Sequence, residues 1–253
     1  MNNFKIIFTD FSTTYIQNAD ENERQNYLLK YDHSLRVLEN CQGICTSLNL
    51  NKNLTSTANI AALFHDTGRF PQYLKYKTFK DANSCNHAIL GVKYILRKKL
   101  LANLPKSQLR TILGSVALHN RNKLPENLPE HLKITTKIVR DSDKIDIMGI
   151  LLSHMKNVAT SNSVPLMDLK EIPEKLTESI LLSLEECKQA SYQEMQCLND
   201  FRMLLLSWAY DLNFKWSKKQ MINRGFVETL FYGLPKTPRV EKLYLPIMNQ
   251  LKS

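Results

Sequence analysis

The chain has 253 residues, 43% of them hydrophobic and 23% charged, which is typical of a soluble globular protein of one or two domains. Only seven residues are glycine, and no stretch alternates apolar and polar residues for long. These features argue against a β-sandwich, a barrel, a P-loop fold and a Rossmann fold. No apolar run reaches about 18 residues, so we expect no membrane span, and the N-terminal residues lack the pattern of a secretory signal.

Charge and cysteine content give information on binding partners and on cellular location. Lysine and arginine total 34 against 24 acidic residues, a net charge of +10. We interpret this excess mainly as a solvated surface, with attraction of a phosphorylated ligand as the alternative. No zinc-finger, RRM or basic-zipper pattern is present, so the sequence has no dedicated nucleic-acid motif and such binding is a minor alternative. The five cysteines are odd in number and lack CxxC spacing, which predicts reduced thiols and a cytoplasmic location.

Apolar residues recur at helical spacing almost throughout, so we predict an all-α protein. One long amphipathic helix is expected from Asn22 to Leu50. The next helix has a cap at Thr55–Thr57 and should stop near Gly68, with Pro71 soon after. Further helices are predicted at 84–103, 107–120, 131–155, 174–192, 195–214 and 240–251.

The stretch 157–173 is rich in Asn, Ser and Pro and is predicted to be a loop or linker. It would separate a helical core, 1–156, from a C-terminal helical extension, 174–253, packed on that core. The extension would either cover the mouth of a site or support a homodimer, and the sequence leaves both uses open.

The histidines carry the chemical signal. Four of the six lie on or at the end of predicted helices among apolar residues, whereas His131 and His154 are interpreted as bystanders. One such histidine is usually a core residue, but four together with a carboxylate favour a site for Zn, Fe, Mn or a similar ion. A carboxylate directly after a histidine at a helix end could bridge two metals. The four are His33, His65, His87 and His119, and Asp66 follows the second of them.

A further acidic ligand is expected from the helix at 131–155. Asp143 and Asp146 lie on the side that carries apolar residues, and helix geometry does not separate them. Asp141 falls closer to the opposite, solvated stripe. That stripe is made of Lys133, Lys137, Arg140 and Lys144.

This ordered set resembles the HD-domain metal-dependent phosphohydrolase superfamily. Three segments carry the likeness, which spans roughly residues 25 to 150: His-Ser-Leu-Arg-Val at 33–37, Ala-Ala-Leu-Phe-His-Asp-Thr-Gly-Arg-Phe at 61–70, and Ile-Val-Arg-Asp-Ser-Asp-Lys-Ile-Asp at 138–146. The resemblance implies an HD-type helical bundle that binds one or two divalent metals per chain, which would be Mn, Fe, Mg or Zn.

The resemblance also implies roles for single residues. His33, His65, Asp66 and Asp143 would bind the first metal, and Asp146 would then orient a ligating histidine or Lys144. His87 and His119 stand where binuclear members place extra histidines, so Asp66 would bridge two metals. The His-Asp-Gly-Tyr-Pro signature of the cyclic-dinucleotide branch is absent, and Asn120 follows His119 where that branch has a second histidine. Both departures argue against hydrolysis of cyclic di-GMP.

The expected activity is hydrolysis of a nucleotide or another small phosphate ester, monoester or diester, by metal-activated water. Asp66, Arg69 and Lys144 are the candidate catalytic residues. The side chains of Arg69 and Lys144 would neutralise phosphate oxygens, or else they are surface charges or form structural ion pairs. Arg36 could pair with a nearby carboxylate, and Asn86 or Asn120 could hydrogen-bond the substrate.

Two other classes of function remain open. The same ligands serve lyase or hydratase and di-iron oxygenase chemistry in a minority of the superfamily. A non-catalytic scaffold could instead keep the metal for structure and bind an acidic partner through the basic surface.

Overall fold

The computed structural model describes residues 1–156 and 169–253, apart from the side chains of residues 22 and 156. Within these ranges every regular element is a helix, which confirms the predicted all-α class. The chain forms two compact units, Met1–Asp146 and Ile147–Ser253, which divide inside a long helix. We predicted the division at 157–173, and residues 157–168 of that segment lie outside the described ranges.

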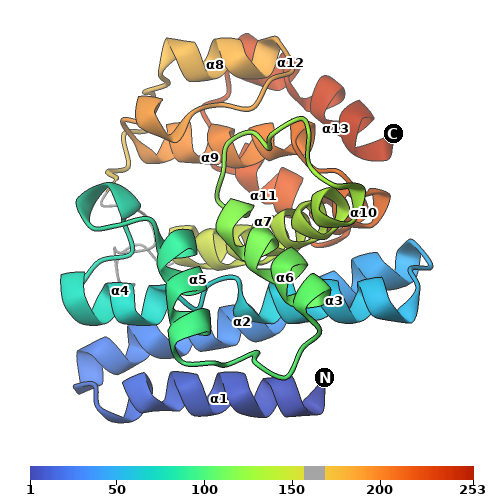
Figure 1. Ribbon diagram of the computed structural model, residues 1–253. Coiled ribbons are helices and arrows are strands. Elements are labelled where there is room, and N and C mark those ends of the chain that lie inside the picture. Colours follow the sequence, from blue (N-terminus) through green and yellow to red (C-terminus); the bar gives the residue numbers. More distant parts are fainter. Residues whose placement is uncertain (157–168) are drawn as a thin grey trace. The chain divides into compact units, whose positions relative to one another are not determined.

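Unit 1 is a bundle of helices around one core. The helix α2 packs against α3, α3 against α6, and α5 against α6, while α1 covers α2 (Figure 1). The short helix η1 precedes α5, and the last helix, α7, continues across the division into unit 2. The helices are α1 (Asn2–Gln17), α2 (Glu21–Ser47), α3 (Lys52–Phe64), α4 (Arg69–Tyr76), η1 (Asp81–Asn83), α5 (His87–Arg97), α6 (Lys106–Leu118) and α7 (Glu130–Lys156).

Side-chain caps set the beginnings of the long helices. The Asp20 carboxylate accepts a hydrogen bond from the backbone N–H of Glu23 at 2.8 Å and begins α2. Asn51 does the same for α3, accepting from the N–H of Leu54 at 2.9 Å. The predicted cap at Thr55–Thr57 is therefore wrong, because those residues lie inside α3.

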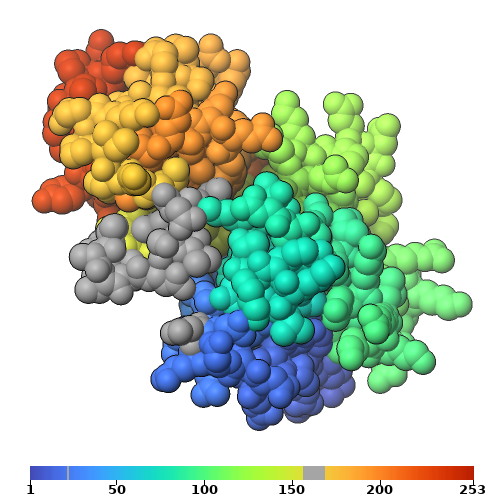
Figure 2. All heavy atoms as spheres, turned by 90° about the vertical axis from the view of Figure 1, so that its left-hand side faces the viewer, coloured from blue at the N-terminus to red at the C-terminus, as the bar shows by residue number. Residues whose placement is uncertain are grey.

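The segment after α3 turns sharply rather than ending the helical region. α3 ends at Phe64, and α4 begins at Arg69 after one turn. Pro71 lies in the first turn of α4, where its missing N–H costs no helical hydrogen bond. Proline was interpreted as a terminator here, so α4 was not predicted. The helix α1 was not predicted either. In Figure 2, α4 and the following loop (teal) form a surface beside the N-terminal helices (blue).

Aromatic side chains hold α1 and α4 onto the bundle. The ring of Phe8 on α1 makes edge contacts with Phe64 at 5.5 Å and with Phe70 at 6.0 Å between centroids. Phe70 also stacks on Tyr27 of α2, and all four side chains are almost completely buried. Aromatic pairs of this kind stabilise the folded state by more than the burial of their apolar area alone. The cluster therefore fixes α4 and the turn before it against α2 and α3.

Unit 2 is a smaller helical assembly in which α9 packs against α8 and α11, and α10 packs against α13. The helix predicted at 195–214 is divided into α9 and η4, and the one at 240–251 is divided into α12 and α13. Neither α10 nor α11 was predicted. The helices are α8 (Glu178–Glu185), η3 (Tyr192–Glu194), α9 (Leu198–Ser207), η4 (Trp208–Tyr210), α10 (Lys215–Asn223), α11 (Phe226–Tyr232), α12 (Pro238–Lys242) and α13 (Tyr244–Lys252). Among the described helices, none combines the length and the apolar character that crossing a membrane requires.

Candidate metal centre

Two carboxylates of α7 meet one histidine of α2. Asp143 Oδ1 lies 3.1 Å from His33 Nε2, and Asp146 Oδ2 lies 2.7 Å from His33 Nδ1. Asp146 also accepts a hydrogen bond from Arg36 Nε at 2.7 Å, so its oxygens are engaged on both sides. Asp146 therefore orients His33, whereas Asp143 Oδ1 is buried without a hydrogen-bond partner among the described residues. The pairing expected for Arg36 is the one observed.

His65 directly follows the last residue of α3 and points at the same place. Its Nδ1 donates to the carbonyl of Ala62 at 2.7 Å, which fixes the ring and directs Nε2 inward. That Nε2 atom lies 3.2 Å from His33 Nε2 and 3.6 Å from Asp143 Oδ1. The ligand atoms of His33, His65 and Asp143 lie within 4.8 Å of one another and could hold a metal ion.

The carboxylate of Asp66 stands between two groups of histidines. Its Oδ2 lies 3.6 Å from His33 Nε2 and 3.8 Å from His65 Nε2. Its Oδ1 lies 3.4 Å from His87 Nε2 and 3.8 Å from His119 Nε2. One carboxylate thus offers one oxygen to each side, the arrangement that a bridging ligand of two cations requires.

The second group of histidines repeats the design of the first. His119 directly follows α6 and donates from Nδ1 to the carbonyl of Val116 at 2.7 Å. His87, the first residue of α5, donates from Nδ1 to Asp81 at 2.7 Å. Their Nε2 atoms lie 3.0 Å apart. Each half of the cluster therefore holds one histidine oriented by a helix carbonyl and one oriented by a carboxylate.

The orientation of the four rings decides what the cluster can bind. A carbonyl or carboxylate oxygen only accepts, so each Nδ1 must carry the proton, and each neutral imidazole keeps a lone pair on Nε2. The Nε2 atoms approach one another at 3.2 Å and 3.0 Å and also face carboxylate oxygens. Acceptors that converge without donors are costly in a buried site, and a cation between them removes that cost. The donor set therefore fits divalent metals.

Two glycines allow the halves to meet. The backbone of Gly68, in the turn after Asp66, lies against α5, and a Cβ at residue 68 would come within 2.5 Å of the amide nitrogen of Gly91. A Cβ at Gly91 would in turn lie 3.1 Å from the nitrogen of Gly68. This close backbone approach brings the first residue of α5, His87, to the side of Asp66.

Two cations flank Asp66. Lys30 Nζ lies 2.9 Å from Oδ2, and Arg69 Nε lies 3.6 Å from Oδ1. Burial by itself would raise the pKa of Asp66, but the charge of Lys30 above all holds it well below its ordinary value. Arg69 Nε is buried and has no hydrogen-bond partner among the described residues. Both cations lie near the ring of Phe79, at 5.3 Å and 6.0 Å from its centroid.

The protonation tendencies of the two halves differ. Burial lowers the pKa of His119 to about 3, helped by the neighbouring His87, so this ring is neutral at pH 7. Burial also lowers the pKa of His87. For His33, burial acts in the same direction, but the carboxylates of Asp143 and Asp146 outweigh it and raise the pKa.

Two expectations about α7 are wrong. Arg140 is buried rather than solvated, because its guanidinium donates to the backbone carbonyls of His119 and Arg121 and so satisfies the end of α6. Asp141 is buried as well. Lys144 is half-buried, and burial together with the charge of Arg140 lowers its pKa to about 7. Its catalytic role stays a prediction.

Sequence reasoning missed two residues of the cluster. Lys30 lies three residues before His33, and that helical spacing could have placed both on one face of α2. Asp81 begins the short helix η1 between α4 and α5, and three residues are too few for a periodicity that reveals the direction of a side chain. Asn120 reaches Asp81 and Asn86 with hydrogen bonds of 3.3 Å, so the amides expected to meet a substrate are partly used by the protein itself.

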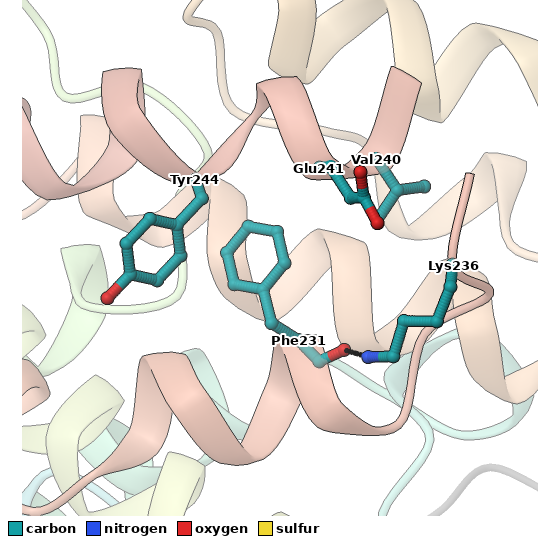
Figure 3. A pocket seen from close by; sticks show the side chains of 5 residues that line it. All are labelled: Phe231, Lys236, Val240, Glu241 and Tyr244. Carbon is teal, nitrogen blue, oxygen red and sulfur yellow. Dashed lines mark hydrogen bonds between the residues drawn. The ribbon is translucent and has the colours of Figure 1, made fainter. Parts of the chain in front are cut away.

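Unit 2 contains an open hollow of about 380 Å³ that none of the cluster residues lines. Its walls are mainly apolar. The ammonium group of Lys236 donates a hydrogen bond of 2.7 Å to the backbone carbonyl of Phe231, drawn as a dashed line in Figure 3. No histidine or cysteine contributes to it. The hollow is lined by Phe231, Lys236, Val240, Glu241 and Tyr244.

Comparison with known proteins agrees with this geometry. Residues 31–148 match the family model of the HD domain, a range that contains all six candidate ligands. No curated protein and no solved structure gives a match to the chain. The match indicates a metal-dependent, hydrolase-type function and, with the helical fold of unit 1, identifies residues 31–148 as an HD domain.

Proposed function

We propose that this HD domain hydrolyses a small phosphate ester, with nucleotides as the first candidates, at a centre of two divalent metals. The observation that carries the proposal is the convergence of four Nε2 lone pairs and two carboxylates, with every Nδ1 proton already donated elsewhere. His33, His65 and Asp143 would hold one metal, and His87 and His119 the other. Asp66 would bridge them.

Divalent metals in such a site would supply hydroxide at neutral pH and stabilise the charge that develops on a phosphoryl oxygen. The protein's part is to hold the ligands rigidly. Asp146 fixes His33, the helix carbonyl of Ala62 fixes His65, and the buried setting strengthens every charge interaction inside the site.

The proposed substrate class follows from the charges at the edge of the cluster. The side chains of Lys30 and Arg69 are each 15% exposed, and that of Asp143 is 17% exposed, whereas the four histidine side chains are at most 5% exposed. Solvent therefore reaches the centre beside two cations. Arg69 Nε is an N–H donor without a partner, and a phosphate oxygen would satisfy it. Lys30 and Arg69 are thus the proposed phosphate-binding residues.

The test combines metal content with turnover. The protein is loaded with Mn²⁺, Fe²⁺, Mg²⁺ or Zn²⁺, its metal content is measured by elemental analysis, and release of phosphate or nucleoside is followed over a nucleotide panel. We expect about two metals per chain and hydrolysis of at least one nucleotide. In Asp66→Ala both should be lost while the helical circular dichroism stays unchanged. The matched control is Asp32→Ala, which removes an exposed carboxylate of α2.

Three results would contradict the proposal in different ways. Equal hydrolysis by the wild type and Asp66→Ala would assign the activity to something other than this centre. Bound metal without hydrolysis of any phosphate ester would favour the scaffold reading or the lyase and oxygenase chemistries. If the chain binds none of these metals, the convergent lone pairs do not form a metal site and the proposal is wrong.

A further inference from the structure

Asp81, in the loop between α4 and α5, accepts hydrogen bonds from four side chains. His87 Nδ1 donates to it at 2.7 Å, and Arg69 Nη1 and Gln72 Nε2 each donate at 2.9 Å. Asn120 Nδ2 completes the set at 3.3 Å. Only a carboxylate offers enough acceptor positions for four donors, because its two oxygens carry about four lone pairs and no proton.

These four donors come from separate parts of unit 1. Arg69 and Gln72 belong to α4, His87 begins α5, and Asn120 follows α6. Gln72 also donates to Ser84 Oγ at 2.8 Å, which ties the loop around Asp81 to α4. Asp81 therefore joins a proposed phosphate-binding residue, a candidate metal ligand and the loop that leads into α5.

The contacts of Asp81 lie on one side of the centre. They reach His87, whose Nε2 faces Asp66 Oδ1, and through it the His119 ring. The other half has its own orienting carboxylate. Asp146 accepts a hydrogen bond from His33 Nδ1 and a second one from Arg36 Nε. The two halves therefore depend on different orienting residues.

We propose that Asp81 is a positioning residue for the second metal position: it builds the half formed by Asp66 Oδ1, His87 and His119, and it couples that half to Arg69. The inference rests on the proposed two-metal centre. It assigns to Asp81 control over whether the second metal is bound, while the half with His33, His65 and Asp143 forms without it.

Asp81→Asn tests this with almost no change in shape. An asparagine offers one acceptor oxygen and turns an amino group toward donors, so at least one of the four hydrogen bonds becomes a donor–donor contact. Loss of such an orienting partner typically weakens metal binding about 10–100-fold. We expect Mn²⁺ titration of the chelator-treated protein to give two tightly bound ions for the wild type. For Asp81→Asn we expect one ion of undiminished affinity and a second ion bound about 10–100-fold more weakly.

A spectroscopic readout separates this role from a merely structural one. Two Mn²⁺ ions that share Asp66 give a spin-coupled electron paramagnetic resonance spectrum, which should be replaced by that of an isolated ion in Asp81→Asn. Asp146→Asn should weaken the first metal position instead, and Asp10→Asn, which alters an exposed carboxylate of α1, should change neither. If Asp81→Asn does not fold, Asp81→Glu serves, since it keeps the charge but displaces His87.

Each outcome decides the inference. Two ions bound to Asp81→Asn with wild-type affinity and a coupled spectrum would overturn it. Equal weakening of both positions would also overturn it, because Asp81 would then act on the whole bundle. Wild-type protein that binds two ions but hydrolyses no phosphate ester would refute the proposed function and leave the inference on Asp81 standing.

Discussion

Each unit of the chain buries a cluster of polar side chains, but the two clusters follow opposite rules. At the start of α9 in unit 2, Asp200 accepts from the backbone N–H and the hydroxyl of Thr177 at 2.8 Å and 2.7 Å. Asn199 Nδ2 donates to three carbonyls of the segment before α8, and Arg202 donates twice to Glu171 at 2.7 Å. In each of these hydrogen bonds a donor meets an acceptor.

At the metal centre of unit 1 the histidine acceptors face one another, and the nearby donor Lys30 reaches only Asp66. The Nε2 atoms of His33 and His65 face each other, as do those of His87 and His119, and Asp66 stands between the pairs. Burial of polar groups alone therefore does not mark a ligand site. Convergence of groups of one kind does, because only an added partner of the opposite character can satisfy them.

The largest expected effect is that of metal on stability. An ion that binds the folded state at a free concentration 100 times its dissociation constant adds about 2.7 kcal/mol, so two ions would add about 5 kcal/mol. Thermal unfolding with Mn²⁺ and with a chelator measures the difference. An unchanged melting temperature would mean that the cluster of unit 1 needs an added cation no more than the cluster of unit 2 does.

Asp200→Ala should have the next largest effect and should leave metal binding intact. It removes the acceptor of the buried Cys197 N–H and of the partly buried donors of Thr177 and Gln196, which we expect to cost about 3 kcal/mol. Urea unfolding measures the cost, and Mn²⁺ titration is the control. Loss of metal binding in this variant would show that the cluster at α9 is not purely structural.

Gly68→Ala should come third, with effects on both stability and metal content. The new Cβ would collide with the backbone of α5, and relief requires α5 to move away from Asp66. We expect a cost of about 2 kcal/mol and weaker binding at the His87 side. Gly225→Ala, at a glycine with open space around its Cβ position but a φ of +66°, controls for backbone strain alone. Normal binding of two ions to Gly68→Ala would show that the close approach is not needed.

The smallest effect concerns Tyr27. Its buried hydroxyl has no hydrogen-bond partner among the described residues, but no other unpartnered group converges on it as the histidines do at the metal centre. Burial, with the charge of Glu23, raises its pKa to about 12 from 10.0. Folded protein thus resists deprotonation, so this group's stabilisation is present below pH 10 and is lost as the pH rises toward 12. At pH 11 the loss is about 1 kcal/mol.

Tyr27→Phe should abolish that loss and, since the stranded hydroxyl disappears, should raise stability at pH 7 by about 1 kcal/mol. Urea unfolding at pH 7 and pH 11 measures both. Destabilisation at pH 7 would mean that even this isolated hydroxyl has a partner.

Much of the fold class and the set of candidate ligands could be read from the sequence, because helical spacing and the order of His and Asp are local properties of the chain. Asp143 and Asp146 illustrate the limit. Both lie on the inward side of α7, as the helical wheel indicated, but only three-dimensional contact shows that both reach His33, Asp146 at Nδ1 and Asp143 at Nε2.

Other features escaped because they depend on partners far along the chain. Arg140 looked like a solvated residue, yet it is buried to satisfy carbonyls at the end of α6. Asp81 owes its importance to donors on α4, on α5 and after α6. α4 itself was hidden by Pro71, a residue whose effect depends on whether a helix begins just before it.

The positions of His65 and His119 have a consequence for how this chain can vary. Each histidine directly follows a helix of 13 residues and is oriented by a carbonyl of the last turn. Inserting or deleting one residue inside α3 or α6 would rotate the following histidine by about 100° and shift it by about 1.5 Å along the axis. The lengths of these two helices are therefore set by the centre, so length changes should be tolerated in the loops that precede them but not within them.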